Sequence, residues 1–430
     1  MAHAHHGHDH ASSTLTTNRT RALLGATVAL LALASVVGAF VLRPQGERPV
    51  LGAELGFTGE LVRATVTDAE SGPCASTEEE DGIRCNLVRI HLTSGPTKGE
   101  TGRFEIPETE AGARLQVGDR IIAQYLPENP ANLRYFFQDF QRGTPLLALL
   151  VIFAVAVIVL GRWQGVRALL ALGVTGVLLV GFAFPSIIDG HDPTLVALVV
   201  AVLVALAALY LTHGITEMIT VALLGTFAAL ALTAALAVVF TRLAHFTGFG
   251  TEDAFYLQLA SAQINVKGLI LAGVIIGSLG VLDDVTVTQA SAVWQLHEAN
   301  PLYTARDLYH SAVTIGRDHI ASTVNTLVLA YTGASLPLLL LFAQTGRSLS
   351  DVVTGELVSV EVVRTLVGSI GLVAAVPLTT ALAAVVVTRG SALRAQTEPA
   401  PRRRTEPAPP RPAPAPASWD EFGPGDGVEF

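Results

Sequence analysis

The sequence predicts a polytopic α-helical membrane protein, with about eight transmembrane helices and a small extracytoplasmic all-β domain of OB-like type. Half of its 430 residues are apolar and only 15% are charged, whereas about a quarter of an average soluble domain is charged. The charges are concentrated in residues 44–143 and nearly absent from long stretches of residues 144–387. Apolar runs of about 18 residues or more are needed to cross a bilayer, not to fill a soluble core.

The net charge of −9 belongs largely to one segment. Residues 44–142 contain 16 acidic and 10 basic side chains, which gives this segment a net charge of −6. Such a balance is typical of a solvated exterior domain and argues against nucleic acid as a partner.

The chain begins with a polar, histidine-rich segment, residues 1–21, which we expect to be a cytoplasmic tail. The apolar stretch 22–42 that follows is long enough to cross about 30 Å of hydrocarbon as a helix, so it is interpreted as an uncleaved signal anchor. A cleaved signal peptide is the alternative, although its apolar region would be shorter and its cleavage site clearer.

Residues 44–143 are predicted to form the β domain. Short β-branched or aromatic segments alternate there with Gly, Pro and Asn, a spacing typical of a small barrel or sandwich. On the outer side of the membrane Cys74 and Cys85 could form a disulfide. The expected strands are 59–66, 84–92, 101–107, 119–126 and 133–140.

Residues 145–388 are predicted to form a domain of seven further membrane helices. The stretch 251–266 has the character of an interfacial or re-entrant helix, and Gly and Pro in 333–337 indicate a broken helix inside a span. The expected spans are 145–161, 166–184, 194–212, 215–240, 267–282, 320–343 and 361–388.

Basic residues at the ends of the spans predict that both termini are cytoplasmic, as the positive-inside rule requires. The short loop 185–193, with acids and a histidine as its ionisable residues, then lies outside, together with the β domain. Residues 389–430, rich in Pro and Arg, are expected to be a disordered cytoplasmic tail. The arginines behind this assignment are Arg19, Arg21, Arg162, Arg167, Arg389 and Arg394.

The first polar cluster follows the sixth expected span. Asp283 and Asp284 are adjacent in an otherwise apolar stretch, and a carboxylate at mid-membrane costs about 2.5–3.5 kcal/mol on insertion scales. On a continuing helix, Asp284 and Thr288 share one polar stripe, and Asp283 and Thr286 share its neighbour. The alternative is that the helix ends at Leu282 and leaves both acids in water.

The second polar cluster opens the seventh expected span. His319 and Ser322 share one helix face, and Asp318, Ser322 and Asn325 share the next. Arg317 could pair with one of the acids, and His319 with an aspartate could relay protons. A purely structural Arg–Asp lock, with the hydroxyls bonded to backbone carbonyls, remains the alternative.

Residues 280–301 (GVLDDVTVTQASAVWQLHEANP) and 315–342 (IGRDHIASTVNTLVLAYTGASLPLLLLF) together resemble the YibE/YibF-like family of bacterial multi-pass membrane proteins. The resemblance covers residues 145–388 and is expected to extend to the anchor and the β domain. It implies a permease-like protein of the plasma membrane without an assigned substrate. It also supports a site made of Asp283, Asp284, Thr286, Thr288, Gln289, Arg317, Asp318, His319 and Asn325.

The leading hypothesis is a permease or secondary transporter whose acids bind a cation or a proton between the sixth and seventh spans. One alternative is a non-transporting assembly or signalling protein that binds an envelope partner through its β domain. Another is an intramembrane metal-dependent hydrolase using the same acids and His319. The sequence contains no HExxH, nucleophile elbow or phosphate-binding glycine loop, so no enzyme activity, cofactor or metal site is predicted.

Overall fold

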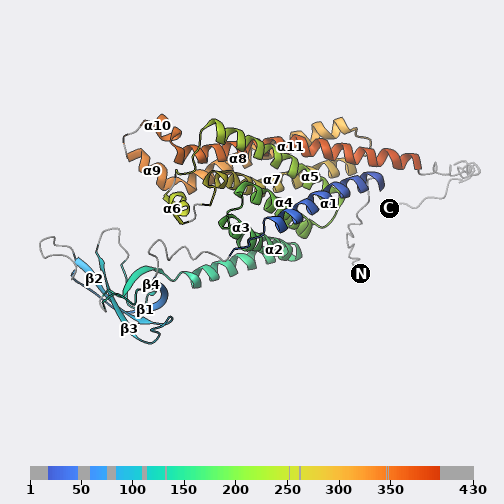
Figure 1. The fold of residues 1–430 in the computed structure, drawn as a ribbon. Helices are drawn as coiled ribbons and strands as arrows, with labels where there is room; N and C mark the ends of the chain where they lie inside the picture. The colour runs from blue at the N-terminus through green and yellow to red at the C-terminus, as the bar shows by residue number, and fades with distance from the viewer. Residues whose placement is uncertain are drawn as a thin grey trace, which may run out of the picture.

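The computed structural model consists of an elongated helical bundle with a small β module beside one of its ends (Figure 1). The histidine-rich start of the chain and the Pro- and Arg-rich tail after Thr397 lie outside the described residues. The structure describes residues 18–46, 59–74, 84–108, 114–130, 133–250, 252–260, 263–344, 346 and 348–397.

Five antiparallel strands form the β module, close to the five expected ranges. Their order in the sheet is β3-β2-β1-β4-β5, and alternate side chains of β1, such as Val62, Ala64 and Val66, are fully or almost fully buried. The two edge strands approach each other where the Thr97 hydroxyl lies 3.0 Å from the Tyr135 hydroxyl, so the sheet curls into a half-barrel. The strands are β1 Glu60–Pro73, β2 Arg84–Leu92, β3 Thr101–Pro107, β4 Arg120–Tyr125 and β5 Tyr135–Phe140.

Covalent and polar contacts hold the ends of the β module. Cys74 and Cys85 form a disulfide between the end of β1 and the start of β2. At the exit toward the bundle, Arg142 donates to Asp139 over 2.6 Å. The Arg142 guanidinium, and after it the Phe140 amide, holds the pKa of Asp139 below its usual range.

The chain enters the module from α1 (Asn18–Val41) along a short segment fixed to the bundle. The Ser186 hydroxyl donates to the Leu42 carbonyl over 2.6 Å, and the Asp189 carboxylate accepts from the amides of Gln45 and Gly46. These contacts attach the linker to α3 (Phe184–Ile188) and the residue after it. The β module is therefore connected to the bundle on both sides.

The apolar stretch after the β module forms α2 (Gly143–Leu178), which continues through the π-helical turn η2 (Leu179–Ala183) into α3. Arg162 interrupts the helical backbone with φ 49° and ψ −130°. Residues eight apart in a straight helix are separated by about 12 Å, yet a Cβ on Gly165 would overlap the Val157 carbonyl. The chain therefore folds back at Arg162, between the two spans expected at 145–161 and 166–184.

Four long apolar helices pack together as the core of the bundle. Their contact faces are rich in small and β-branched residues, including Ala197, Ala229, Val285 and Ala375, which are all completely buried. Close packing of small residues is the usual basis of helix association in a bilayer. The core helices are α4 Pro193–His213, α5 Glu217–Leu243, α7 Val266–Ala299 and α11 Glu356–Thr397.

Helix α8 (Ala305–Ala334) packs chiefly on α11 and also contacts α7. It bends by 62° into α9 (Leu336–Gln344), so the Gly- and Pro-containing segment does break the expected span. Two short helices, α6 (Glu252–Ala260) and α10 (Leu349–Thr354), lie near α9 at the same end of the bundle (Figure 1).

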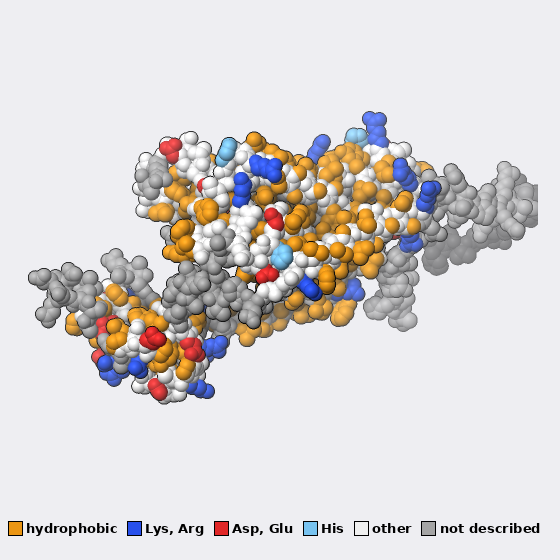
Figure 2. Space-filling view, viewed as in Figure 1, with side chains coloured by type: hydrophobic (Ala, Val, Ile, Leu, Met, Phe, Trp, Pro, Cys, Tyr) orange, Lys and Arg blue, Asp and Glu red, His pale blue; other side chains and the backbone are white. Residues whose placement is uncertain are grey.

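The ends of the helices define two ends of the bundle. Arg21 of α1 forms an ion pair with Glu217 at the start of α5, and Leu24, Trp294, Leu308 and Val387 join one apolar cluster nearby. We call this the Glu217 end and the opposite one the far end. Hydrophobic side chains cover the surface between them (Figure 2), as expected for a lipid-facing belt.

Among the described residues, six helices are long and apolar enough to cross a membrane, and a seventh is counted if α8 and α9 form one bent span. The helix Gly143–Ile188 is 46 residues long, far more than the 20 or so that one crossing needs. Large side chains on α1 and α2, such as Leu30 and Ile152, are about two-thirds exposed. The fold is therefore that of a membrane protein carrying a small β half-barrel.

Candidate functional site in the helix bundle

Asp283 and Asp284 lie in the middle of a continuous helix. The amide side chain of Asn265 caps α7 by accepting from the Gly268 amide over 3.0 Å, and the helix runs on to Ala299. Leu282 and Val285, on either side of the acids, are completely buried against neighbouring helices. The alternative in which the helix ends at Leu282 is therefore wrong, because the apolar pattern continues past the acids.

The depth of the acids follows from the neighbouring helix α5. The hydroxyls of Thr226 and Thr286 lie 2.7 Å apart, and Thr226 is nine residues from Glu217, or about 14 Å along the helix. Asp283 lies one turn further along α7, about 18 Å from the Glu217 end. A bilayer is about 40–45 Å thick with its headgroups, so if the Glu217 end lies at one membrane surface, this depth corresponds to the middle of the bilayer.

The carboxyl group of Asp283 faces α5 in apolar surroundings. Its Oδ1 atom is buried and has no hydrogen-bond partner among the described residues, while the Thr226 hydroxyl lies beside the carboxyl group. Thr286 donates to the Asp283 carbonyl over 3.1 Å. A buried carboxylate is tolerated where a proton, a cation or a donor compensates it, so this position suits binding of a proton or a small cation.

Asp284 points the other way, toward α8. Its Oδ2 atom lies 3.9 Å from Nε2 of His319, and 74% of its side chain is exposed. This distance is an ion-pair contact and exceeds that of a hydrogen bond. Thr288 extends the same outward stripe and donates to the Asp284 carbonyl over 2.8 Å. The two adjacent acids therefore belong to two different faces of α7.

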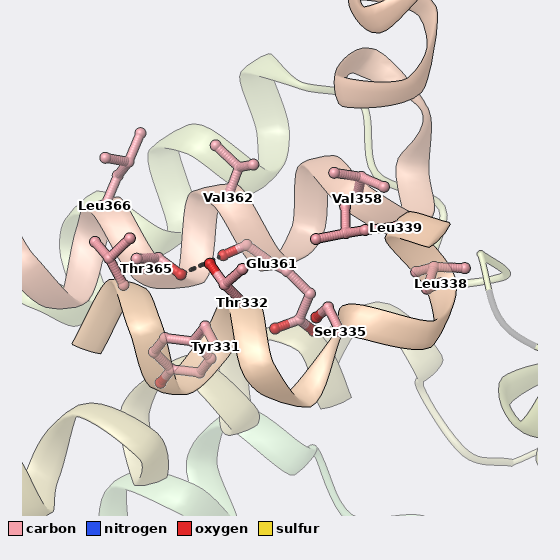
Figure 3. A pocket seen from close by; sticks show the side chains of 11 residues that line it. Tyr331, Thr332, Ser335, Leu338, Leu339, Val358, Glu361, Val362, Thr365 and Leu366 are labelled. Carbon is pink, nitrogen blue, oxygen red and sulfur yellow. Dashed lines mark hydrogen bonds between the residues drawn. The ribbon is translucent and has the colours of Figure 1, made fainter. Parts of the chain in front are cut away.

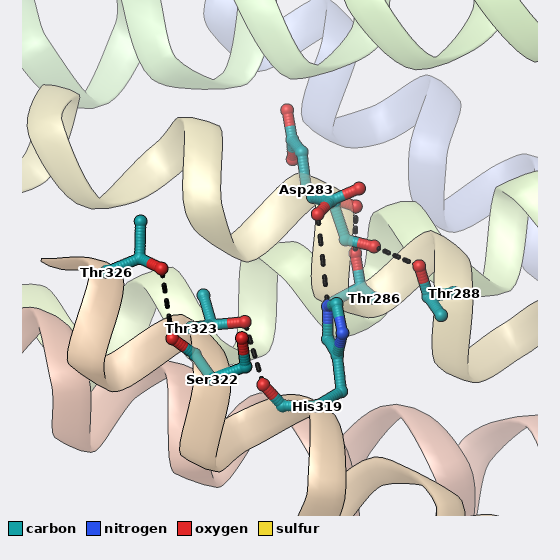
Figure 4. A network of polar contacts seen from close by, with 8 residues as sticks. Asp283, Thr286, Thr288, His319, Ser322, Thr323 and Thr326 are labelled. Atoms are coloured by element: carbon teal, nitrogen blue, oxygen red, sulfur yellow. Dashed lines mark hydrogen bonds and ion pairs between the residues drawn. The ribbon is translucent and has the colours of Figure 1, made fainter.

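Helix α8 presents its polar residues mostly away from α7. Thr304 and Asp307 form a capping box that starts the helix, and His319 is the polar residue that reaches toward the acids. Thr323 donates to the His319 carbonyl over 2.8 Å and Thr326 to the Ser322 carbonyl over 3.0 Å (Figure 4). These two hydroxyls bond to backbone carbonyls, as predicted by the alternative in which the second polar cluster is purely structural.

Several residues expected in the site lie outside it. Arg317 is exposed and, within the described part of the chain, forms no ion pair with either acid; His319, two residues along, takes the place next to Asp284. A two-residue step turns a helix by about 200°, so the two side chains leave opposite faces. Asp318, Ser322 and Asn325 are exposed as well.

Gln289 forms a buried crossing of three helices. Its amide bridges α7 to the Ala312 carbonyl of α8 and to the Thr380 hydroxyl of α11, in either orientation of the amide group. A Cβ on Gly316 would overlap this amide and the Val376 side chain, so only glycine lets α8 approach here. Gln289 thus holds three helices together on the Glu217 side of the acids, and it is not an open part of the predicted ion pathway.

A second charged group, which the sequence analysis did not select, lies toward the far end. Arg364 of α11 donates to Glu361 over 2.6 Å, and each side chain is about one-quarter exposed. Tyr331 lies close to this pair, in the wall of a cavity between α8, α9 and α11 (Figure 3). The sequence signal that could have indicated this pair is a Glu and an Arg three residues apart in a long apolar segment.

Comparison with known families agrees with this arrangement. The profile described as YibE/F-like protein matches residues 149–389, more than half of the chain.

This chain belongs to the YibE/F-like family.

In this YibE/F-like protein the matched region contains both acids, His319 and the Glu361–Arg364 pair, whereas α1 and the β module lie before it. Comparison with curated proteins gave no match, and comparison with solved structures gave none. Among the described residues, no three His, Cys, Asp or Glu side chains are grouped to hold a metal ion.

Proposed function

We propose that this YibE/F-like protein is a permease or secondary transporter of the plasma membrane, without enzyme activity, and that Asp283 is its proton- or cation-binding group. One observation carries the proposal: the Asp283 carboxylate lies at mid-bilayer depth with a buried, unpartnered oxygen. Ionisable residues at such depth in membrane proteins usually serve ion or proton movement. Asp284 and His319, on the adjacent face, form the outward part of the same polar region.

We further propose eight membrane crossings. The fold-back at Arg162 divides Gly143–Ile188 into two arms of about 19 and 26 residues, each long enough for a crossing. The number of crossings rises from six to eight when the two arms are counted separately and α8 with α9 is counted as one bent crossing.

An even number places both termini on one side, and we assign the Glu217 end to the cytoplasm. Its α1, α8 and α11 helices carry Arg19, Arg21, Arg306 and Arg389, in keeping with the positive-inside rule. The β half-barrel, whose curled five-stranded sheet is of the size of an OB-like domain, then lies outside the cell. Its disulfide suits that oxidising location.

The test is ion flux in proteoliposomes that contain the full-length protein. Proton movement is followed with an entrapped pH-sensitive dye under an imposed potential, and cation movement with radioactive sodium. We expect flux above that of empty vesicles and a loss of about a hundredfold or more in Asp283→Asn, the size of effect that a positioned proton-transfer group contributes in enzymes.

The matched control is Glu298→Gln, because Glu298 is an exposed acid at the end of the same helix α7. Glu298→Gln should retain the wild-type flux of both ions. Unchanged flux in the double variant Asp283→Asn with Asp284→Asn would exclude the role assigned to the acids.

A further inference from the structure

The far end of the bundle contains a second polar group that the proposed transport site does not use. Glu361 and Arg364 face inward from α11 at the point where two cavities meet, one of about 230 Å³ and one of about 290 Å³. Glu361 lines both cavities, and Arg364 lines the larger one. An ion pair placed between two cavities is accessible to a ligand on either side.

Arg364 has unused hydrogen-bonding capacity, and Glu361 is the acid that both cavities share. Arg364 donates to Glu361 through Nη1, but its Nε is buried and has no partner among the described residues. Glu356, the other acid of the larger cavity, is by contrast fully engaged, since it accepts from the Thr247 amide and hydroxyl and from the Gly248 amide. Arg364 can therefore accept an anionic group, and Glu361 a cationic one.

The smaller cavity offers an apolar surface next to these charges. Figure 3 shows Glu361 beside Ser335 and Thr332, with Val358, Val362 and Leu339 around them. The cavity lies where α8 bends into α9, and large apolar side chains of α9 outside it, such as Leu340, are more than half exposed. A ligand that fits this site carries one negative and one positive group at its polar end, and the rest of it is apolar.

The depth of the Glu361–Arg364 pair in the membrane indicates that such a ligand comes from the bilayer. Gly371 of α11 contacts Thr233, which is sixteen residues from Glu217, or about 24 Å along α5. Arg364 and Glu361 lie a further seven and ten residues along α11, about 34 and 39 Å from the Glu217 end. The hydrocarbon layer is about 30 Å thick and the headgroups extend it to about 40–45 Å, so the pair lies at headgroup level.

From these observations we infer that the Glu361–Arg364 pair binds the headgroup of a zwitterionic phospholipid. The lipid phosphate is held by Arg364, its ammonium group by Glu361, and the start of an acyl chain by the apolar cavity lined by Val362. Guanidinium groups bind phosphate through charge-assisted hydrogen bonds, which are the strong ones in proteins. The inference does not depend on whether the protein transports an ion.

Native mass spectrometry of the full-length, delipidated protein tests this inference. The probes are phosphatidylethanolamine, phosphatidylglycerol, diacylglycerol and soluble glycerophosphoethanolamine. We expect phosphatidylethanolamine to bind most tightly. Glu361→Gln and Arg364→Gln should each weaken it about tenfold, the effect of losing one charge-assisted contact.

Two further variants separate binding from folding. Val362→Phe fills the cavity without changing the ion pair, and it should weaken phosphatidylethanolamine binding to a similar extent. Asp139→Asn removes an acid from an ion pair of the same spacing and the same 2.6 Å contact, in the exposed β module, and should bind as the wild type does.

Three results would overturn the inference. Equal binding of phosphatidylglycerol would show that the ammonium group is not recognised. Equal binding of the soluble headgroup would identify a free zwitterion, not a lipid, as the ligand. Wild-type lipid binding in both Glu361→Gln and Arg364→Gln would show that the pair is not part of the lipid-binding site.

Discussion

The hydroxyl groups of Thr226 and Thr286 lie 2.7 Å apart and join α5 to α7 directly beside the Asp283 carboxyl group. Both threonines are completely buried, so this contact closes the α5 side of the bundle at the depth of the acid. Asp284, the next residue, is exposed on the opposite side. The adjacent acids therefore differ in surroundings: Asp283 lies at a buried contact between two helices, whereas Asp284 is largely exposed.

The Thr226–Thr286 contact should contribute measurably to stability. Thr226→Val and Thr286→Val each remove one hydroxyl without changing the side-chain shape greatly, and interhelical hydrogen bonds in bilayers contribute about 0.6 kcal/mol on average. A double-mutant cycle of unfolding free energies in mixed micelles should give a coupling energy of about this size. A coupling energy of zero would show that the two hydroxyls do not interact.

Gly316 should tolerate no side chain. A Cβ there would overlap the Gln289 amide and Val376, so we expect Gly316→Ala to lower the free energy of unfolding by about 1–3 kcal/mol, the usual effect of overpacking. Gly333→Ala on the same helix is the control, because nothing lies within 4 Å of that position. Thermal unfolding in detergent would compare them, and equal stability of the two variants would contradict the crossing described above.

The disulfide of the β module should stabilise it chiefly through the unfolded state. Cys74 and Cys85 are 11 residues apart, and closing a loop of this order contributes about 3 kcal/mol in the chain-entropy description. Cys74→Ser with Cys85→Ser should therefore make the module more sensitive to protease at raised temperature. Wild-type protein treated with a reductant should behave like the double variant; full resistance of both would refute the prediction.

The Asp139–Arg142 pair should make the β module slightly less stable in acid. The pKa of Asp139 is lowered in the folded state, so its contribution is present above the unfolded pKa and is lost as the pH falls through the folded one. Asp139→Asn should melt below the wild type at about pH 7, and the difference should vanish below the carboxyl range, about pH 3. The effect is small because both side chains are about half exposed.

Much of the fold could be predicted because it depends on local pattern. The β strands alternate in period two between turn residues, and the membrane helices are long apolar runs, so both were recognisable in the sequence. Helix ends were less predictable: α7 continues seventeen residues beyond Leu282 because its later residues pack on α8 and α11. The apolar pattern does resume after Leu282, but the two acids interrupt it, so the packing on α8 and α11 decides where the helix ends.

The candidate site was predictable in part. Asp284 and His319 do come together, since helical spacing and neighbouring helices suffice to bring them near, whereas Asp283 faces α5 instead. The predicted pairing of Arg317 with an acid was wrong because Gly316 packs against the Gln289 amide. This contact fixes the rotation of α8 about its own axis and turns Arg317 away from the acids. The Glu361–Arg364 pair was missed because the cavity beside it is completed by Tyr331 and Ser335, which come from another part of the chain.

The reversal of the chain at Arg162 has a consequence for biogenesis. Under the eight crossings proposed above, a translocation machinery that inserted residues 143–188 as one uninterrupted segment would place every later loop on the opposite side of the membrane. In that topology, the backbone conformation at Arg162, with Gly165 packed against Val157, determines the orientation of every later helix in the membrane.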